Sequence, residues 1–268
     1  MTTASSTPSF APYEVYAIKY AEADALPPGK VGIGLDPHHS LFDMAYYIWL
    51  IRRGDEVVVV DTGFNVSSGA KRGRRLLRSP AEPLQQLGVN LHMVQTLIVT
   101  HLHYDHVGNS SLFPVATFHL QDKEMAFATG RYMRHAFFRD MYEIDDVMGF
   151  VRDVYAGRVI FHDGDAEIMP GVTVHLASGH TPGVQFVRVW TRSGWLVLAS
   201  DACHYTFLRE REQVYPVVFD PGGLIETYAR LSALATEDRL VIPGHDPSVL
   251  RNFPAARPDL AGIAVRLD

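Results

Sequence analysis

The sequence predicts a single α/β domain over residues 1–268, and three observations carry this prediction. Short apolar, β-branched runs such as residues 96–99 are typical of buried strands. Residues 121–157 and 224–235 show helical periodicity. No charge run, repeat or low-complexity linker divides the 268 residues.

The first half of the chain is expected to contribute the strands of one sheet. These strands are predicted at residues 13–20, 44–52, 56–60 and 96–99. Residues 53–55 form a hairpin turn between two of them, and residues 25–40 form a loop. Residues 64–80 look irregular, and residues 80–87 predict a short helix that ends at Gly88.

The second half alternates a helical segment with further strands. Strands are predicted at residues 116–120, 159–161, 166–169, 172–176, 184–190, 195–199 and 240–242. Those from 159–161 to 172–176 are expected to belong to a second β-layer. A helical insert at about 121–157 is rich in aromatic and methionine side chains, and a Pro-rich stretch and a short tail end the chain.

Composition excludes several classes of partner. A net charge of −6, with 47% hydrophobic and 20% charged residues, is that of an ordinary globular protein and predicts no binding to nucleic acid or anionic membranes. The basic stretch 71–75 is interpreted as a solvated loop or helix face. Cys203 is the only cysteine, so an intrachain disulfide is excluded. Residues 1–12 lack the pattern of a signal peptide, and no apolar run approaches bilayer length, so we expect a cytoplasmic protein.

The richest cluster of chemical groups is His101-Leu102-His103-Tyr104-Asp105-His106, just after a predicted strand. Imidazoles and carboxylates are ligands for zinc, iron and manganese. His101 and His103 are two apart on an extended segment and point the same way. Asp105 and His106 come after the chain has turned and can address a second point. The pattern therefore favours two neighbouring metals over a solvated histidine-rich loop.

Three more ligand candidates follow predicted strands or lie in turns bounded by glycine. They are His180, Asp201 and His245. A lone histidine in such a turn is more often structural than a ligand. The repeated placement of a candidate after a strand favours a shared site.

These residues resemble the motifs of the metallo-β-lactamase superfamily, and the chain is most similar to its N-acyl-homoserine-lactonase-like branch. The resembling pieces are His101 to His106, Asp61-Thr62-Gly63, Gly179-His180-Thr181-Pro182-Gly183, Ser200-Asp201 and Gly244-His245-Asp246. The resemblance implies an αββα sandwich of two mixed β-sheets flanked by helices. It implies that His101, His103 and His180 hold a first metal, that Asp105, His106 and His245 hold a second, and that Asp201 bridges them. The two divalent ions are expected to be zinc, although iron or manganese also suits such ligands.

The resemblance also implies a reaction. A hydroxide that bridges the metals attacks the carbonyl of a lactone, and Asp105 and Asp201 are the carboxylates of the reaction centre. Lactonases of this branch carry a tyrosine three residues after the bridging aspartate, whereas this chain has His204 there and Tyr205 next. Either residue can supply the oxyanion donor.

The substrate is expected to be a small, neutral, hydrophobic lactone, with N-acyl-homoserine lactone as the first expectation. Tyr104 stands where related lactonases carry an aromatic residue that lines the acyl pocket. Phe138 and Met141, in the insert, are the other expected wall residues. Arg131, Arg134 and Arg139 are expected to face solvent.

Three alternatives stay open. A thioesterase of the glyoxalase type uses nearly the same ligands but usually has a longer C-terminal extension than the 23 residues that follow His245. Another ester or cyclic-amide hydrolase fits the same ligand set. A metal-binding module without catalysis is the non-enzymatic alternative, and a homodimer is compatible with the sequence.

Overall fold

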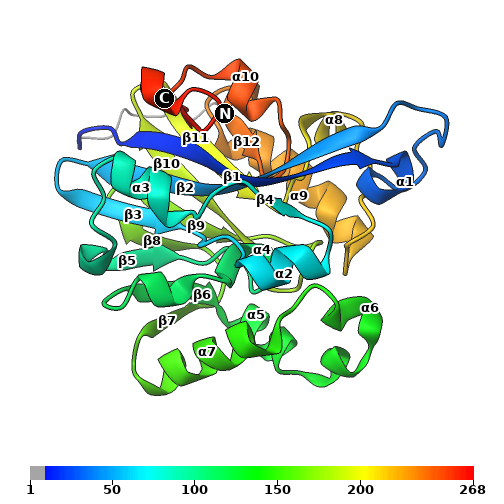
Figure 1. The fold of residues 1–268 in the computed structure, drawn as a ribbon, viewed down its shortest axis with the longest axis horizontal. Coiled ribbons are helices and arrows are strands. Elements are labelled where there is room, and N and C mark those ends of the chain that lie inside the picture. Colours follow the sequence, from blue (N-terminus) through cyan, green and yellow to red (C-terminus); the bar gives the residue numbers. More distant parts are fainter. Residues whose placement is uncertain (1–9) are drawn as a thin grey trace, which may run out of the picture.

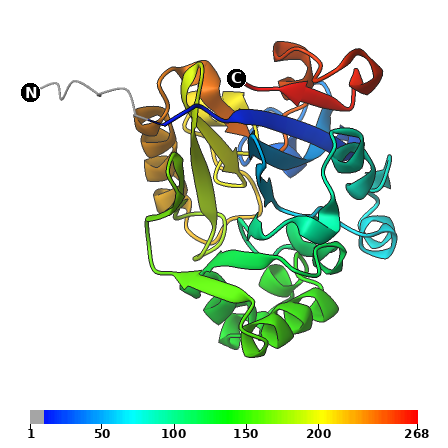
Figure 2. The same cartoon turned by 90° about the vertical axis from the view of Figure 1, so that its left-hand side faces the viewer.

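Two β-sheets lie face to face with helices on their outer sides in the computed structural model, which describes residues 10–268 (Figure 1). Figure 2 shows the layers from the side, with the gold helix outside the yellow-green strands and the cyan and teal helices beside the blue and cyan strands. The predicted αββα sandwich is confirmed. The segment 1–12, which does not resemble a signal peptide, lies mostly outside the described residues.

The first sheet has eight strands among the described residues. Its order is β13 (Ala264–Arg266), β1 (Glu14–Leu26), β2 (Phe42–Arg53), β3 (Glu56–Val60), β5 (Thr96–Ile98), β6 (Thr117–Gln121) and β7 (Val159–His162), and β4 (Arg75–Leu76) pairs with β1. Strands β3, β5, β6 and β7 are parallel to one another, whereas β2 is antiparallel to β1 and β3, and β1 is antiparallel to β13. The parallel part places several carboxyl-terminal strand ends on one edge of the sheet.

The second sheet has five strands among the described residues. Its order is β12 (Val241–Pro243), β11 (Gly194–Ser200), β10 (Gln185–Thr191), β9 (Val172–Leu176) and β8 (Ala166–Met169). Neighbouring strands are antiparallel except for β11 and β12, which are parallel. The carboxyl ends of β11 and β12 therefore lie together.

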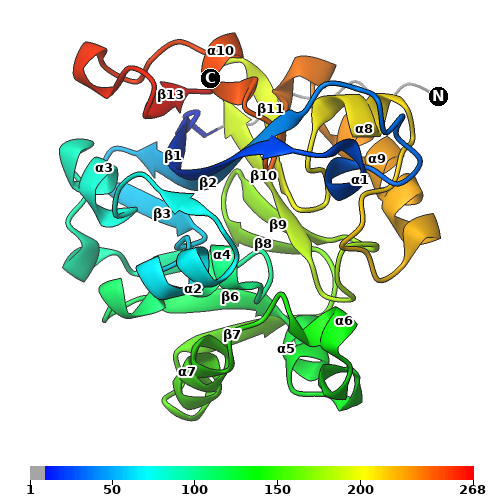
Figure 3. The same ribbon diagram turned by 45° about the vertical axis from the view of Figure 1, so that its right-hand side comes forward.

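Short helices and turns connect the strands. The α-helices are α1 (Pro28–Val31), α2 (Val66–Lys71), α3 (Ala81–Gln86), α4 (Tyr104–Val107), α5 (Asp122–Ala128), α6 (Ala136–Arg139), α7 (Ile144–Tyr155), α8 (Thr206–Glu210), α9 (Pro221–Leu234) and α10 (Val249–Asn252). The 3-10 helices are η1 (Leu91–Met93), η2 (Ser110–Leu112), η3 (Arg131–Arg134), η4 (Asp238–Leu240) and η5 (Pro258–Leu260). Helices α5, α6 and α7 gather at the end of the molecule where β6 and β7 lie (Figure 3).

The alternation of side chains along β2 explains how the layers are held together. Tyr47 and Trp49 enter the core between the two sheets, where they meet residues such as Val187. Ile48 and Leu50 point the other way, into the core under the outer helices. Because both faces are apolar, β2 is buried on both sides and lies in the middle of the sandwich.

Three expectations about the elements are wrong. Residues 159–161 form β7 and join the first sheet, because β7 pairs in parallel with β6. Residues 64–80 are more regular than expected, since the Asn65 side chain accepts a hydrogen bond from Ser68 N–H and caps α2. The expected tail contains α10 and β13, which pairs with β1. No helix between residues 10 and 268 is both long and apolar enough to span a bilayer.

Candidate metal centre

Strand ends from both sheets converge on one site. Asp61 follows β3, and the His101–His106 loop follows the neighbouring parallel strand β5. Asp201 and His245 follow β11 and β12, which are parallel neighbours in the other sheet. Because parallel strands end at the same edge, four separate chain segments deliver polar side chains to one place.

Three imidazoles meet at the first point of the site. His101 Nε2 lies 3.0 Å from His103 Nδ1, and His180 Nε2 lies 3.1 and 2.9 Å from these two atoms. All three side chains are buried. Burial, together with the neighbouring imidazoles, lowers the pKa of His101 and His103 well below the usual value, and burial lowers the pKa of His180 to about 3. The rings are therefore neutral and have lone pairs available for a cation.

Four ligand candidates surround the second point, and Asp201 connects it to the first. Asp201 Oδ1 lies 3.3 Å from His106 Nε2 and 3.1 Å from His245 Nε2. Asp201 Oδ2 lies 3.3 Å from both His180 Nε2 and His245 Nε2. Asp105 Oδ2 stands 3.6 Å from both His106 Nε2 and His245 Nε2. The Asp201 carboxylate thus lies between the two histidine clusters.

Charge is balanced differently at the second point. Burial alone would lower the pKa of His106 and His245, but the Asp201 and Asp105 carboxylates raise both, and Asp61 adds to the effect at His106. Burial would also raise the pKa of Asp201, but the surrounding histidines hold it well below its usual range. In the protein alone, positive charge on these histidines therefore balances negative charge on the carboxylates.

Hydrogen bonds behind the site orient the ligand candidates. His180 Nδ1 donates to the Val217 carbonyl at 2.8 Å, and His245 Nδ1 donates to the Ala45 carbonyl at 2.9 Å. A carbonyl oxygen only accepts, so Nδ1 carries the proton in the neutral form of each ring. The lone pair of Nε2 is then free to bind a cation. Asp61 accepts hydrogen bonds from His106 Nδ1 and from the amide and hydroxyl of Thr100. These contacts fix the direction of the His106 ring.

Two orphaned atoms test whether the residues fit a metal. His106 Nε2 and Asp201 Oδ1 are buried without a hydrogen-bond partner although they face each other. Because His106 Nδ1 already donates to Asp61, a neutral His106 has no proton left for Asp201. Two lone pairs then point at one space, which is the arrangement that a cation satisfies. The donor set of imidazoles and carboxylates suits zinc, iron or manganese.

His204 and Tyr205 have different surroundings. His204 Nε2 lies 3.0 Å from Asp201 Oδ2, and its ring stacks on Tyr215 at a centroid distance of 3.6 Å. The Tyr215 hydroxyl donates to the Asp201 carbonyl. Tyr205 points away, because its hydroxyl donates to the Asp43 carbonyl at 3.0 Å. Of the two candidates, only His204 lies at the ligand cluster.

A small apolar pocket adjoins the first point. Its lining includes His103 and His180 from the site, Phe127 in α5, Phe138 in α6 and Met141 just after α6. Two of the three expected substrate-binding residues therefore border the ligand cluster. The exposed residues Arg131, Arg134 and Arg139 face solvent as expected.

Tyr104, the third expected wall residue, is not in this pocket. Its ring lies between Phe64, at a centroid distance of 5.7 Å, and the Arg72 guanidinium, 4.0 Å from the ring centre. Arg72 also pairs with Glu143. The basic stretch 71–75 is thus partly packed against the metal loop, not fully solvated as expected. Tyr104 instead borders a separate cavity with Arg72 and Arg74.

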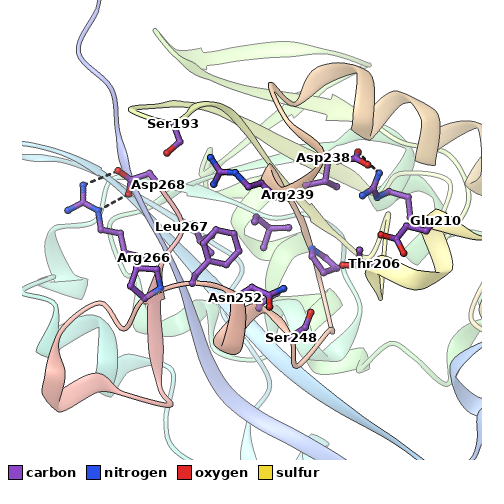
Figure 4. A pocket seen from close by; sticks show the side chains of 17 residues that line it. Ser193, Thr206, Glu210, Asp238, Arg239, Ser248, Asn252, Arg266, Leu267 and Asp268 are labelled. Carbon is purple, nitrogen blue, oxygen red and sulfur yellow. Dashed lines mark hydrogen bonds and ion pairs between the residues drawn. The ribbon is translucent and has the colours of Figure 1, made fainter.

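Another cavity, of about 640 Å³, lies beside β12, α10 and β13 (Figure 4). None of the seven ligand candidates lines it. Its charged groups largely pair with each other, as Arg209 does with Asp238 and Arg266 with Asp268. The cavity therefore has no converging set of reactive groups, and the chemistry is concentrated at the ligand cluster.

Comparison with known proteins agrees with this geometry. The family model of the metallo-beta-lactamase superfamily matches residues 42–245. The chain belongs to this superfamily. It is 31% identical to the N-acyl homoserine lactonase AttM of Azorhizobium caulinodans over 183 residues, 65% of this chain and 66% of the relative.

Solved structures have the same fold. An N-acyl homoserine lactone hydrolase with N-hexanoyl-L-homoserine at its catalytic metal centre superposes with a TM-score of 0.75, at 22% identity over 91% of this chain and 98% of that one. AidC, a dizinc quorum-quenching lactonase, superposes with a TM-score of 0.68, at 16% identity over 89% of each chain.

Sequence reasoning missed two residues that contact the site from outside the motifs. Tyr215 stacks on His204, and Glu124 connects the loops that carry the first three histidines. Tyr215 lies in a segment for which no element was predicted. Glu124 lies in the predicted helical insert. A buried carboxylate near the start of a helix cannot be distinguished from an exposed one by pattern alone.

Proposed function

We propose that this protein is a metal-dependent hydrolase that opens a lactone ring, with N-acyl homoserine lactone or a related neutral, hydrophobic lactone as its substrate. The observation that carries the proposal is Asp201, whose carboxylate lies between two clusters of buried histidines. The lactonase relatives and neighbours support the choice of substrate class. A single domain with a helical insert over about residues 121–157 suits this assignment.

His101, His103 and His180 would hold one divalent ion, and Asp105, His106 and His245 a second, with Asp201 between them. Zinc is the first choice, which the dizinc lactonase neighbour supports, and iron or manganese also suits the donors. Two such ions would supply Lewis acidity and lower the pKa of water at the site.

The chain's own groups handle the protons and the developing charge. In ring opening, a water molecule loses a proton and the resulting hydroxide adds to the acyl carbon; the ring C–O bond then breaks and leaves an alkoxide. Asp201 would accept the proton that the water loses and deliver it to the alkoxide. The Nε2–H group of His204, which the Tyr215 ring holds beside Asp201, would shift from the Asp201 carboxylate to the developing oxyanion. Tyr205 is assigned no part in this step.

The apolar pocket explains the preference for a hydrophobic substrate. Phe138 and Met141 lie next to His103, so an acyl chain that enters here is in contact with the reaction centre. Methionine and aromatic side chains adapt to flexible apolar groups. We therefore place the acyl chain or an equivalent apolar substituent in this pocket.

A substrate panel tests the proposal. Protein loaded with zinc is assayed with acyl-homoserine lactones, small aliphatic lactones, aromatic lactones and thioesters, and Asp201→Asn is the inactive control. We expect kcat/KM to be highest for a lactone. A thioester as the best substrate would favour the glyoxalase-type alternative, and no turnover of any member would favour the non-catalytic one.

A further inference from the structure

A fully buried carboxylate, Glu124 in α5, has no place in the chemistry described above. Its Oε1 accepts hydrogen bonds from the Leu102 amide at 3.0 Å and from the Tyr142 hydroxyl at 2.9 Å. Its Oε2 accepts one from the Thr181 hydroxyl at 2.5 Å. The Gly183 amide also bonds to it. Four donors from three separate chain segments thus surround one side chain.

Each partner of Glu124 lies next to a ligand of the first cluster. Leu102 stands between His101 and His103 in the chain, and Thr181 directly follows His180. The Tyr142 ring packs edge-on against the His103 ring, with centroids 4.6 Å apart. Glu124 therefore connects the loop that carries two of the histidines to the turn that carries the third.

The second cluster is oriented by other groups. His106 is oriented by Asp61, and His245 donates to the Ala45 carbonyl. No hydrogen bond recorded for Glu124 within residues 10–268 reaches those segments. A change at Glu124 should therefore act on one cluster more than on the other.

Close packing of α5 against the His180 turn supports the same conclusion. A Cβ atom at Gly183 would collide with the Glu124 backbone, so glycine is required for this approach. Two of the four donors are backbone amides, which can only donate, so the position needs an acceptor without protons of its own. A carboxylate meets this need with both oxygens, whereas the amide of a glutamine would turn donors toward donors.

We propose that Glu124 is a positioning residue that holds the His101–His103 loop and the His180 turn at the separation required by the first metal ion. The carboxylate does not contact the reacting atoms. It acts through backbone and hydroxyl groups beside the three histidines. Its removal should loosen the first metal and leave the second in place, and this holds whatever substrate the enzyme uses.

Metal binding gives a readout that does not depend on activity. Apo protein is titrated with Zn²⁺ in competition with a chromogenic chelator, for the wild-type chain, Glu124→Gln and the matched control Glu143→Gln. Glu143 is a carboxylate of the same region that pairs with Lys71 and Arg72. We expect Glu124→Gln to lower the affinity for one of the two ions by about 10–100-fold, the usual effect of losing an outer partner of a metal ligand. The control should change neither affinity.

Double variants identify which ion is weakened. Adding His245→Ala to Glu124→Gln should leave little tightly bound metal, whereas adding His103→Ala should leave one ion. The proposal would be overturned if a folded Glu124→Gln protein bound both ions with wild-type affinity. It would also be overturned if the affinity for both ions fell equally. If Glu124→Gln does not fold, Thr181→Val removes one donor only. This variant should lower the affinity for the same ion by a smaller factor. An unchanged affinity for that ion in Thr181→Val would equally overturn the proposal.

Discussion

The Asp61 carboxylate accepts a hydrogen bond from His106 Nδ1 at 2.7 Å, so that Nε2 of the same ring faces Asp201. Asp61 has a backbone φ of +62°, a region that non-glycine residues seldom occupy. It is also fully buried and bonded to the Thr100 amide and hydroxyl. A residue held in an unfavourable backbone conformation by this many contacts is one whose side chain must point in a fixed direction.

Replacing Asp61 by alanine should weaken metal binding. Without its partner, His106 can adopt the other tautomer or rotate, so we expect metal affinity to fall by about 10–100-fold. Chelator competition measures the change. Asp165→Ala is the matched control, because Asp165 makes a similar bond of 2.9 Å to His175 away from the ligand cluster. Equal losses in the two variants would contradict the orienting role of Asp61.

His204→Ala and Tyr205→Phe should differ in turnover. The loss of one oxyanion donor typically lowers kcat by about 10²-fold, so we expect that effect for His204→Ala at unchanged metal content. Tyr205→Phe loses only a bond to the Asp43 carbonyl, which should cost about 1 kcal/mol of stability and little activity. Steady-state kinetics with elemental analysis measures both. Normal turnover in His204→Ala would show that the donor lies elsewhere.

The kcat/KM for a lactone should depend on the length of its acyl chain, because the chain is placed in the apolar pocket. Each methylene that becomes buried adds up to about 0.8 kcal/mol, so kcat/KM should rise along a homologous lactone series until the pocket is filled. Phe138→Ala or Met141→Ala should flatten this rise and leave the shortest substrate nearly unchanged. Kinetics across the series measures the slope. A flat profile in the unmodified enzyme would contradict the assignment of this pocket.

Asp146, in the first turn of α7, should make the protein less stable as pH rises. Burial and the nearby Glu143 and Asp145 raise the pKa of Asp146 to about 6, and one of its oxygens has no hydrogen-bond partner. A carboxyl whose folded pKa lies above its unfolded value of 3.8 loses stabilisation as pH passes from about 4 to 6.

The variant Asp146→Asn should remove the loss of stability that accompanies the rise in pH, because asparagine carries no charge. We expect it to raise the free energy of unfolding by about 1–2 kcal/mol at pH 8, after allowance for solvent screening, and by much less at pH 4.5. Urea denaturation at the two pH values measures the difference. Asp163→Asn, at an exposed position outside α7, is the control. A gain that does not depend on pH would contradict the electrostatic cause.

The sequence predicts the ligand cluster well because each member follows a strand. Asp61, Asp201 and His245 come directly after apolar runs, and parallel strands bring such positions to one edge. That rule needs no knowledge of distant packing. It was enough to predict which side chains would meet, and the resemblance added how they divide into two groups.

Residues that act through packing were not predictable in this way. Tyr104 was expected to line the acyl pocket, but Arg72, some 30 positions earlier, covers its ring. The short strand β13 pairs with β1 at the other end of the chain, and a three-residue strand has too little pattern to indicate a partner. In both cases the deciding contact is between segments far apart in sequence.

The dependence of lactone hydrolysis on metal tests the central claim most directly. Metal-free protein is titrated with Zn²⁺, and the hydrolysis of an acyl-homoserine lactone is followed at each addition. We predict that activity reaches its maximum when two ions are bound per chain, because the ligand candidates gather in two groups with Asp201 between them. Full activity with one bound ion, or no hydrolysis with two, would contradict the account.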